Sequence, residues 1–213
     1  MRVIPPLAAA VVLSLASPSF AQTWIEYQSR ADFFGVNFPG EPKVQDITSL
    51  TENSITLPGR VYSHEEGGSR YSVTVVDYTL AARQRACSGL SARDAGANGD
   101  RCGDRAARDV KGAIAHATSK FIQRDVKVTF NATCSADRVE GRCLQLLGPD
   151  GSRTFAAIHM HEDRLYIFEG TTPARAPVPA LFQQSVGFLD KDGRRIRYAS
   201  TYSNGAPPPP RQR

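Results

Sequence analysis

The chain has 213 residues, of which 41% are hydrophobic, and carries 26 basic against 21 acidic side chains. This length suits one domain with its own core, since domains usually hold roughly 100–200 residues. The net charge of +5 is small, and acidic residues lie beside the densest basic cluster, which is Arg194, Arg195 and Arg197. Nucleic-acid binders usually show a basic stripe with interleaved aromatic residues, so the charge pattern indicates no nucleic-acid partner.

The first 21 residues have the three parts of a secretory signal. Arg2 supplies a positive charge, residues 3–15 are mainly apolar, and Ser19-Phe20-Ala21 fits a small-x-small cleavage site. The apolar run is shorter than the roughly 20 residues that a membrane span needs. We therefore expect a signal peptide over residues 1–21 and a mature chain from Gln22 that has no integral membrane segment.

Short strands follow in chain order. Residues 24–27 and 32–38 are the first two, and the second ends at Pro39-Gly40. Phe34, Val36 and Phe38 alternate with smaller residues, so they share one face, and we expect them to pack under the long helix described below. Weaker strand patterns cover residues 44–50 and 55–57.

The clearest hairpin is centred on Gly67-Gly68. Two glycines supply the positive φ angles of a tight two-residue turn. The register that follows pairs His64 with Tyr71, Tyr62 with Val73 and Arg60 with Val75. This register places the tyrosines and valines on one face.

Four cysteines form two sequence pairs, Cys87 with Cys102 and Cys134 with Cys143. An even number in an exported chain predicts disulfides, although four cysteines allow three connectivities. We favour Cys87–Cys102 and Cys134–Cys143, because each pair flanks its own turn-rich segment. Zinc is the alternative, but the spacings differ from those of zinc-binding motifs.

A helix and a run of strands make up the second half. The helix follows Asp104 as its cap, with apolar positions at Val110, Ile114, Ala117 and Phe121. Strand patterns then cover residues 126–134, 143–147, 154–160 and 165–170, with 187–190 and 195–200 as closing elements; residues 177–185 predict a short helix. We expect residues 204–213, "NGAPPPPRQR", to be a disordered proline-rich tail.

The pattern around Cys134 predicts a second register. The odd-even alternation places Val126, Val128, Phe130 and Cys134 on one face. With Cys134 opposite Cys143, Ala132 faces Gln145 and Phe130 faces Leu147. The side chains of Phe130 and Leu147 are then expected on the same side of the hairpin as the two sulfur atoms.

Hairpins dominate this layout, so the predicted fold class is α+β, with a mainly antiparallel sheet and helices packed on it. Residues 22–203 form the single predicted domain.

Several stretches, taken in order, resemble a known family. They are "FFGVNFPGEPKV", the hairpin strand "RYSVTVVDY", the helix at Arg108-Asp109, and "DRLYIFEG" followed by "LFQQSVGFLD". Together they are similar to exported PsbP-like proteins of Gram-negative bacteria. The resemblance covers about residues 24–200 and implies an α/β/α sandwich of the PsbP-like type. It carries over no catalytic residue.

The segment "HMHED" is the strongest local candidate for chemistry. His159 and His161 are two residues apart on a predicted strand, so both imidazoles project from one face. With a carboxylate they could hold Zn²⁺ or Cu²⁺, and His64 or Asp77 are the candidates for a third ligand. The competing interpretation, which we favour, is two solvent-facing histidines without metal, and we expect no cofactor.

The chain has no motif for a nucleophile elbow, a His-Glu-x-x-His zinc site or a phosphate-binding loop. We therefore predict a non-enzymatic periplasmic binding or accessory protein, whose partner is an envelope protein or a small ligand. The alternative is a metal-dependent hydrolase that uses His159 and His161.

Export is directly testable. N-terminal sequencing of the protein taken from its native host should begin at Gln22, because the cleavage pattern ends at Ala21. A mature chain that still begins at Met1 would contradict the predicted signal peptide.

Overall fold

The computed structural model describes residues 24–79 and 102–212. Within these ranges the chain forms ten strands and two helices. In chain order they are β1 (Ile25–Ser29), β2 (Phe34–Phe38), β3 (Lys43–Leu50), β4 (Thr56–Glu66), β5 (Ser69–Asp77), α2 (Cys102–Ile122), β6 (Lys127–Ala136), β7 (Val139–Leu147), β8 (Arg153–His161), β9 (Arg164–Thr172), α3 (Ala180–Gln184) and β10 (Gly187–Phe188).

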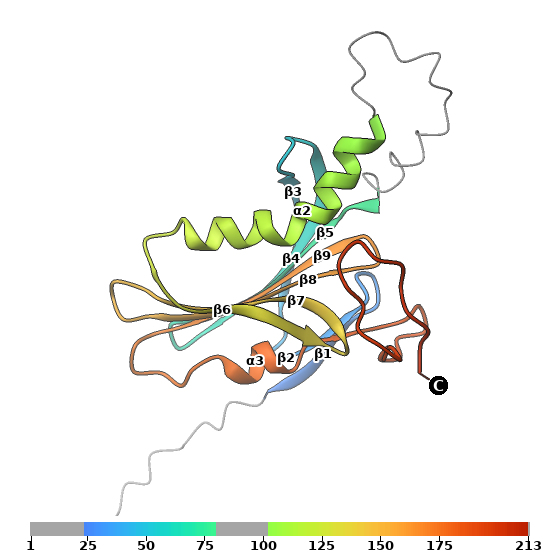
Figure 1. Ribbon diagram of the computed structural model, residues 1–213. Helices are drawn as coiled ribbons and strands as arrows, with labels where there is room; N and C mark the ends of the chain where they lie inside the picture. The colour runs from blue at the N-terminus through green and yellow to red at the C-terminus, as the bar shows by residue number, and fades with distance from the viewer. Residues whose placement is uncertain (1–23, 80–101, 213) are drawn as a thin grey trace, which may run out of the picture.

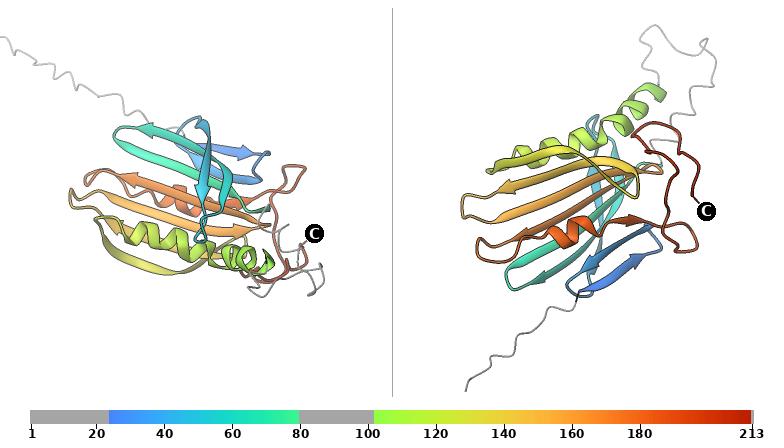
Figure 2. Two further views of the ribbon diagram at one scale, coloured as in Figure 1. Left: turned by 90° about the horizontal axis from the view of Figure 1, so that it is seen from above. Right: turned by 60° about the horizontal axis from the view of Figure 1, so that its bottom comes forward.

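The strands form two antiparallel sheets (Figure 1). The large sheet has seven strands in the order β3-β4-β5-β9-β8-β7-β6, and the small sheet has the order β1-β2-β10. Helix α2 lies on one face of the large sheet, whereas α3 and the small sheet lie on the other (Figure 2). The predicted α+β class, an antiparallel sheet with helices packed on it, is confirmed, although the first two strands form a separate sheet.

The stripe predicted on the long helix faces the sheet. Of the predicted positions, Val110, Ala117 and Phe121 are buried and Ile114 is half-buried, and all four pack with residues of β7, β8 and β9 in one apolar cluster that also contains Ala113. Steps of three and four residues repeat every helical turn, which keeps these side chains on one side. The helix begins at Cys102, so Asp104 lies in its first turn and is not its cap as predicted.

Asp109 ties α2 to the turn between β3 and β4. Its carboxylate is buried and accepts hydrogen bonds from the Thr51 hydroxyl at 2.8 Å and the Asn53 amide at 2.7 Å. A buried carboxylate needs such partners to offset its loss of water, so this contact fixes the position of the helix along the sheet.

The opposite face of the large sheet carries a mainly aromatic core. Phe34, Val36 and Phe38 are fully buried there, together with Phe182 of α3 and Phe188 of β10. Our expectation that these β2 residues pack under the long helix is therefore wrong. They pack on the face that α2 does not reach, because β2 belongs to the small sheet.

The hairpin of β4 and β5 has the predicted register. His64 lies opposite Tyr71, Tyr62 opposite Val73, and Arg60 opposite Val75. Gly67 and Gly68 have φ angles of 56° and 77°, as a tight turn of this hand requires. The glycine pair thus sets the register of the whole hairpin.

The hairpin of β6 and β7 corrects the predicted register. Its turn has only two residues, Asp137 and Arg138, both with positive φ, so Cys134 lies opposite Gly141 and Cys143 lies opposite Ala132. The disulfide therefore joins diagonal positions, with Cα atoms 5.7 Å apart, which is within the usual range.

A bulge near the start of β6 changes the predicted faces. The register shifts between Val128 and Phe130, so Val128 packs toward α2 while Phe130 lies on the face of the disulfide. One inserted residue reverses the alternation of side chains, and no sequence pattern marked this insertion. Phe130, Leu147 and the sulfurs nevertheless share one side, as predicted.

The C-terminal segment lies against the domain. Tyr202 forms a parallel bridge with Val139, and Tyr198 forms an antiparallel bridge with Arg211. Asn204 donates a hydrogen bond from its side chain to the Lys111 carbonyl at 2.9 Å. Residues 204–212 thus differ from the disordered tail that we expected, because backbone and side-chain contacts hold them.

Among the described residues, neither α2 nor α3 is both long enough and apolar enough to cross a membrane. Cys87 and the side chain of Cys102 lie outside the described residues, so their pairing stays a prediction.

Peptide mapping without reduction tests both bridges. We expect one linked peptide pair for Cys134–Cys143 and another for Cys87–Cys102. Replacing Cys134 and Cys143 together by serine should lower the free energy of unfolding by roughly 2–3 kcal/mol, since the bridge closes a loop of about ten residues. Urea unfolding of the double variant checks this value, and a link between Cys87 and Cys134 or Cys143 would contradict the pairing.

Candidate functional site

His159 and His161, the predicted site residues, are buried. Each side chain is only 1% exposed, so our interpretation of them as solvent-facing is wrong. Strand β8 lies between β7 and β9, and the small sheet and the C-terminal segment cover its face on this side. The ring of Phe188 in β10 lies 4.5 Å from the His161 ring, measured between centroids.

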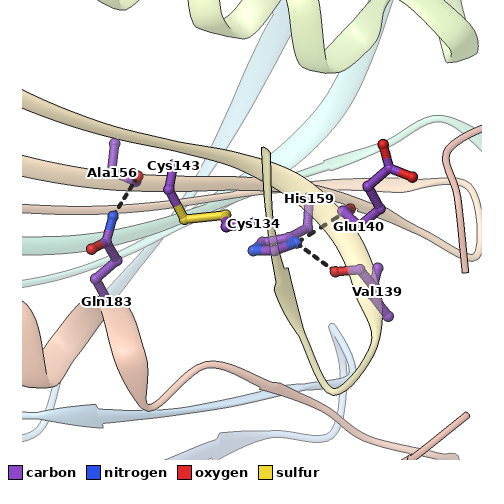
Figure 3. The surroundings of a disulfide bond; sticks show 7 residues. All are labelled: Cys134, Val139, Glu140, Cys143, Ala156, His159 and Gln183. Atoms are coloured by element: carbon purple, nitrogen blue, oxygen red, sulfur yellow. Dashed lines mark hydrogen bonds between the residues drawn. A yellow bond between two sulfur atoms is a disulfide. The ribbon is translucent and has the colours of Figure 1, made fainter. Parts of the chain in front are cut away.

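His159 is held by backbone carbonyls. Its Nδ1 lies 3.2 Å from the Val139 oxygen and 3.4 Å from the Glu140 oxygen (Figure 3). A carbonyl oxygen only accepts, so Nδ1 carries the proton. Burial lowers the pKa of His159 to about 4, and the imidazole is therefore neutral at pH 7.

The close approach of this ring depends on a glycine. Gly141 lies opposite His159 in the β7–β8 register, and a Cβ atom there would lie 2.3 Å from Nδ1. Any other residue at position 141 would push the imidazole out of its place.

His161 is held by a tyrosine of the C-terminal segment. Its Nε2 lies 2.7 Å from the Tyr198 hydroxyl oxygen, and Tyr198 is fully buried. Burial, followed by the nearby positive charge of Arg211, lowers the pKa of His161 to about 3. Arg211 itself donates to the Glu162 carboxylate at 2.7 Å, which closes the cluster toward solvent.

The arrangement does not gather a metal-ligand set. No group of three or more His, Cys, Asp or Glu side chains in the described ranges is placed to hold a metal ion. His64 has Nδ1 3.1 Å from the Glu41 carbonyl oxygen, and Asp77 accepts from the Thr79 backbone N–H. Neither suggested third ligand therefore joins the two histidines.

A buried carboxylate that the sequence reading missed lies in the turn between β1 and β2. Tyr62 donates its hydroxyl to Asp32 at 2.5 Å, and Arg60 forms an ion pair with the same oxygen at 3.3 Å. The Tyr166 hydroxyl donates to the Asp32 backbone carbonyl at 2.9 Å. Burial and then the bond to Asp32 raise the pKa of Tyr62 to about 12.

The sequence pattern predicts Asp32 within the second strand, but β2 begins at Phe34, so Asp32 lies in the turn before it. The next residue, Phe33, has a φ of 55°, which is rare for a bulky side chain. This conformation turns the chain sharply enough to place Asp32 and Phe34 against the large sheet. The carboxylate and its partners therefore fix the small sheet on the large one.

The chemistry available to these buried groups is limited. A general acid or base works best with a pKa near the ambient pH, and both imidazoles have values far below 7. A general base must also reach a substrate proton, and both rings are enclosed. The contacts of His159, His161 and Asp32 instead connect the large sheet to the small sheet and to the C-terminal segment.

Open space lies on the surface instead. One cleft of about 380 Å³ is formed where α3 meets the small sheet, and its lining includes Glu26, Asn37, Leu181, Gln184 and Arg195. Arg195 is fixed there by Asp137 at 2.6 Å and by the Val186 carbonyl at 2.8 Å. We refer to this feature as the α3 cleft.

A second cleft of about 390 Å³ lies outside the histidine cluster, where Glu162 and Arg211 belong to its wall. Phe33, Leu189 and the turn 190–192 form the remainder of its lining. Glu162 and Arg211 form an ion pair in this wall, and the Tyr198 hydroxyl that contacts His161 lies 3.5 Å from the Glu162 carboxylate.

The disulfide lies close to the candidate histidine and to α3 (Figure 3). Gln183 of α3 donates from its side chain to the Ala156 carbonyl of β8 at 2.7 Å, on the same side of the sheet. This bond anchors α3, and so it helps to fix one wall of the α3 cleft.

Comparison with solved structures gives a fold similarity. The solution structure of cyanobacterial PsbP (CyanoP) from Synechocystis sp. PCC 6803 matches with a TM-score of 0.44 and 15% sequence identity, covering 83% of this chain and 99% of that one. This is a likeness in fold to the group of proteins that the sequence stretches resemble. No protein-family model and no curated protein matches the chain.

The buried imidazoles predict a loss of stability in acid. Because the folded pKa of His159 lies below the ordinary 6.5, the unfolded chain binds a proton between about pH 6.5 and 4 that the folded protein does not bind. The free energy of unfolding should therefore decrease as the pH is lowered across this window, by about 1.4 kcal/mol per pH unit for each buried histidine. Urea unfolding at several pH values measures this slope.

His161→Phe provides the specific comparison, since its site is surrounded by the rings of Phe188, Tyr198 and Tyr202. This variant should reduce the acid slope by the share of one buried histidine, about 1.4 kcal/mol per pH unit. An unchanged slope in His161→Phe would contradict the buried, neutral imidazole.

Proposed function

We propose that this protein is a non-enzymatic binding or accessory protein of the cell envelope, which acts in the periplasm or outside the cell. The observation that carries the proposal is the burial of both candidate histidines. Each imidazole is 1% exposed and bonded to protein groups, so neither is free to act on a substrate.

Two features support the location. The first 21 residues have the pattern of a secretory signal, and Cys134 and Cys143 form a disulfide. Disulfides persist mainly in oxidising compartments such as the periplasm. The disulfide and the predicted signal peptide therefore both support the proposed location.

We place the binding function at the α3 cleft. Its volume of about 380 Å³ is at the lower end for small-molecule sites and also suits one or two side chains of a protein partner. Leu181 is 48% exposed at its wall, while Asn37, Gln184 and Arg195 provide polar groups around it. An exposed apolar anchor within a polar rim is the usual composition of a protein-binding surface, so an envelope protein is the proposed partner.

The rival function is a metal-dependent hydrolase that uses His159 and His161. It would require the small sheet to move away, because both rings lie beneath β10 and the C-terminal segment. It would also require ligands from other elements, which the described part of the chain does not bring to the two rings.

Affinity capture from a periplasmic extract tests the cleft. We expect the mature chain, residues 22–213, to retain an envelope protein that Leu181→Asp no longer retains, since a charge would replace the apolar anchor. Val44→Asp is the matched control, because Val44 is 53% exposed on β3 and lies outside the α3 cleft. Equal loss in both variants, or no loss in Leu181→Asp, would contradict the proposal.

Calorimetry with Zn²⁺ and Cu²⁺ on tag-free protein tests the rival function in parallel. We expect no submicromolar binding. Tight binding that is lost in both His159→Ala and His161→Ala would favour the hydrolase.

A further inference from the structure

Strand β6 is an edge of the large sheet. It pairs with β7 on one side, and no described strand pairs with its other side (Figure 1). The two-residue turn makes Ala136 and Val139 a hydrogen-bonded pair, and such pairs alternate along an antiparallel ladder. The backbone groups of Asn131, Thr133 and Ser135 therefore point outward, away from β7.

This edge has little of the usual protection. Apart from Lys127, its first residue, β6 includes no charged residue and no proline. The opposite edge, β3, carries Lys43 and Asp46 within its eight residues. Natural edge strands commonly use charged residues, especially lysine, to prevent pairing with another chain. Only the bulge between Val128 and Phe130 interrupts β6, and it leaves residues 130–136 as a regular, unpaired edge.

We propose that β6 pairs with β6 of a second copy of this chain, antiparallel, to form a two-fold dimer. The register that uses the whole regular segment is centred on Thr133, because this residue is the midpoint of 130–136. A closed two-fold dimer uses the same edge of both copies, so it leaves no β6 edge open for further growth.

The segment is complementary to itself in this register. Phe130 would lie opposite Ala136 of the partner subunit, and Ala132 opposite Cys134 of the partner subunit. A large side chain thus meets a small one, and no two like charges face each other. On the other face Thr133 would lie opposite its own copy, a pair that commonly stabilises antiparallel strands.

The exposure of Phe130 is consistent with a second copy of the chain at this edge. Phe130 is 45% exposed on an edge strand, whereas Tyr62, Tyr71, Tyr166 and Phe168 of the same sheet are buried. Pairing with a second copy would cover part of its ring by the neighbouring strand, and this burial favours the dimer through the hydrophobic effect. The inference is independent of the α3 cleft, which uses other residues.

Sedimentation equilibrium of residues 22–213 tests the dimer. We expect a reversible monomer–dimer equilibrium in the micromolar range or below. Thr133→Lys places two lysines opposite each other at the two-fold axis, so it should weaken dimerisation by at least roughly tenfold. Thr48→Lys, an exposed position on the other edge strand, is the matched control and should leave the equilibrium unchanged.

Charge complementation excludes an indirect effect on folding. Thr133→Glu alone should also be monomeric, whereas an equal mixture of Thr133→Lys and Thr133→Glu should restore a dimer that contains one copy of each. Circular dichroism should show the native spectrum for every variant. A monomer at all concentrations, a dimer insensitive to Thr133→Lys, or open-ended assembly would overturn the proposal.

Discussion

The large sheet has apolar side chains on both faces, and the rest of the structure depends on how each face is covered. Helix α2 covers one face with a single stripe of buried residues. The other face carries many aromatic side chains, whose exposure to water would be unfavourable. Three separate parts cover it: the small sheet, α3 and the C-terminal segment. These parts come from both ends of the described chain, and β10 pairs with β2. This face of the sheet is therefore buried only when the N-terminal and C-terminal segments pack on it together.

This cover determines the state of the polar groups beneath it. Asp32 keeps its place through Tyr62 and Arg60, and the two histidines keep theirs through backbone carbonyls and Tyr198. Each of these three side chains has a partner, which offsets the cost of its removal from water. The same burial that makes the imidazoles useful for holding the layers makes them poor acids and bases at neutral pH.

The two binding surfaces that we propose therefore lie on the outside of the domain. The α3 cleft owes its shape to the cover, since Gln183 anchors α3 to β8 and Asp137 holds Arg195 at the rim. The free edge of β6 owes its regularity to the turn at Asp137 and Arg138, which aligns the last seven residues of the strand with β7. The β6–β7 hairpin, with its disulfide, thus supports both proposed surfaces.

The sequence by itself determined the local elements. The hairpin at Gly67-Gly68, the stripe of α2 and the pairing of Cys134 with Cys143 follow from periodicity and from turn chemistry, which act over a few residues. The antiparallel class followed from the number of hairpins. In each case the information lies within the segment that it describes.

Only the tertiary structure decided which face each element covers. The alternation of Phe34, Val36 and Phe38 predicts a buried face but not the sheet to which β2 belongs. The spacing of His159 and His161 places them on one face, yet their burial depends on Phe188 and Tyr198, which lie 27 or more residues further along the chain. One inserted residue in β6 placed Val128 on the face opposite to that of Phe130 and the disulfide. Burial of this kind is decided by contacts between distant segments, and a local pattern of side chains does not encode those contacts.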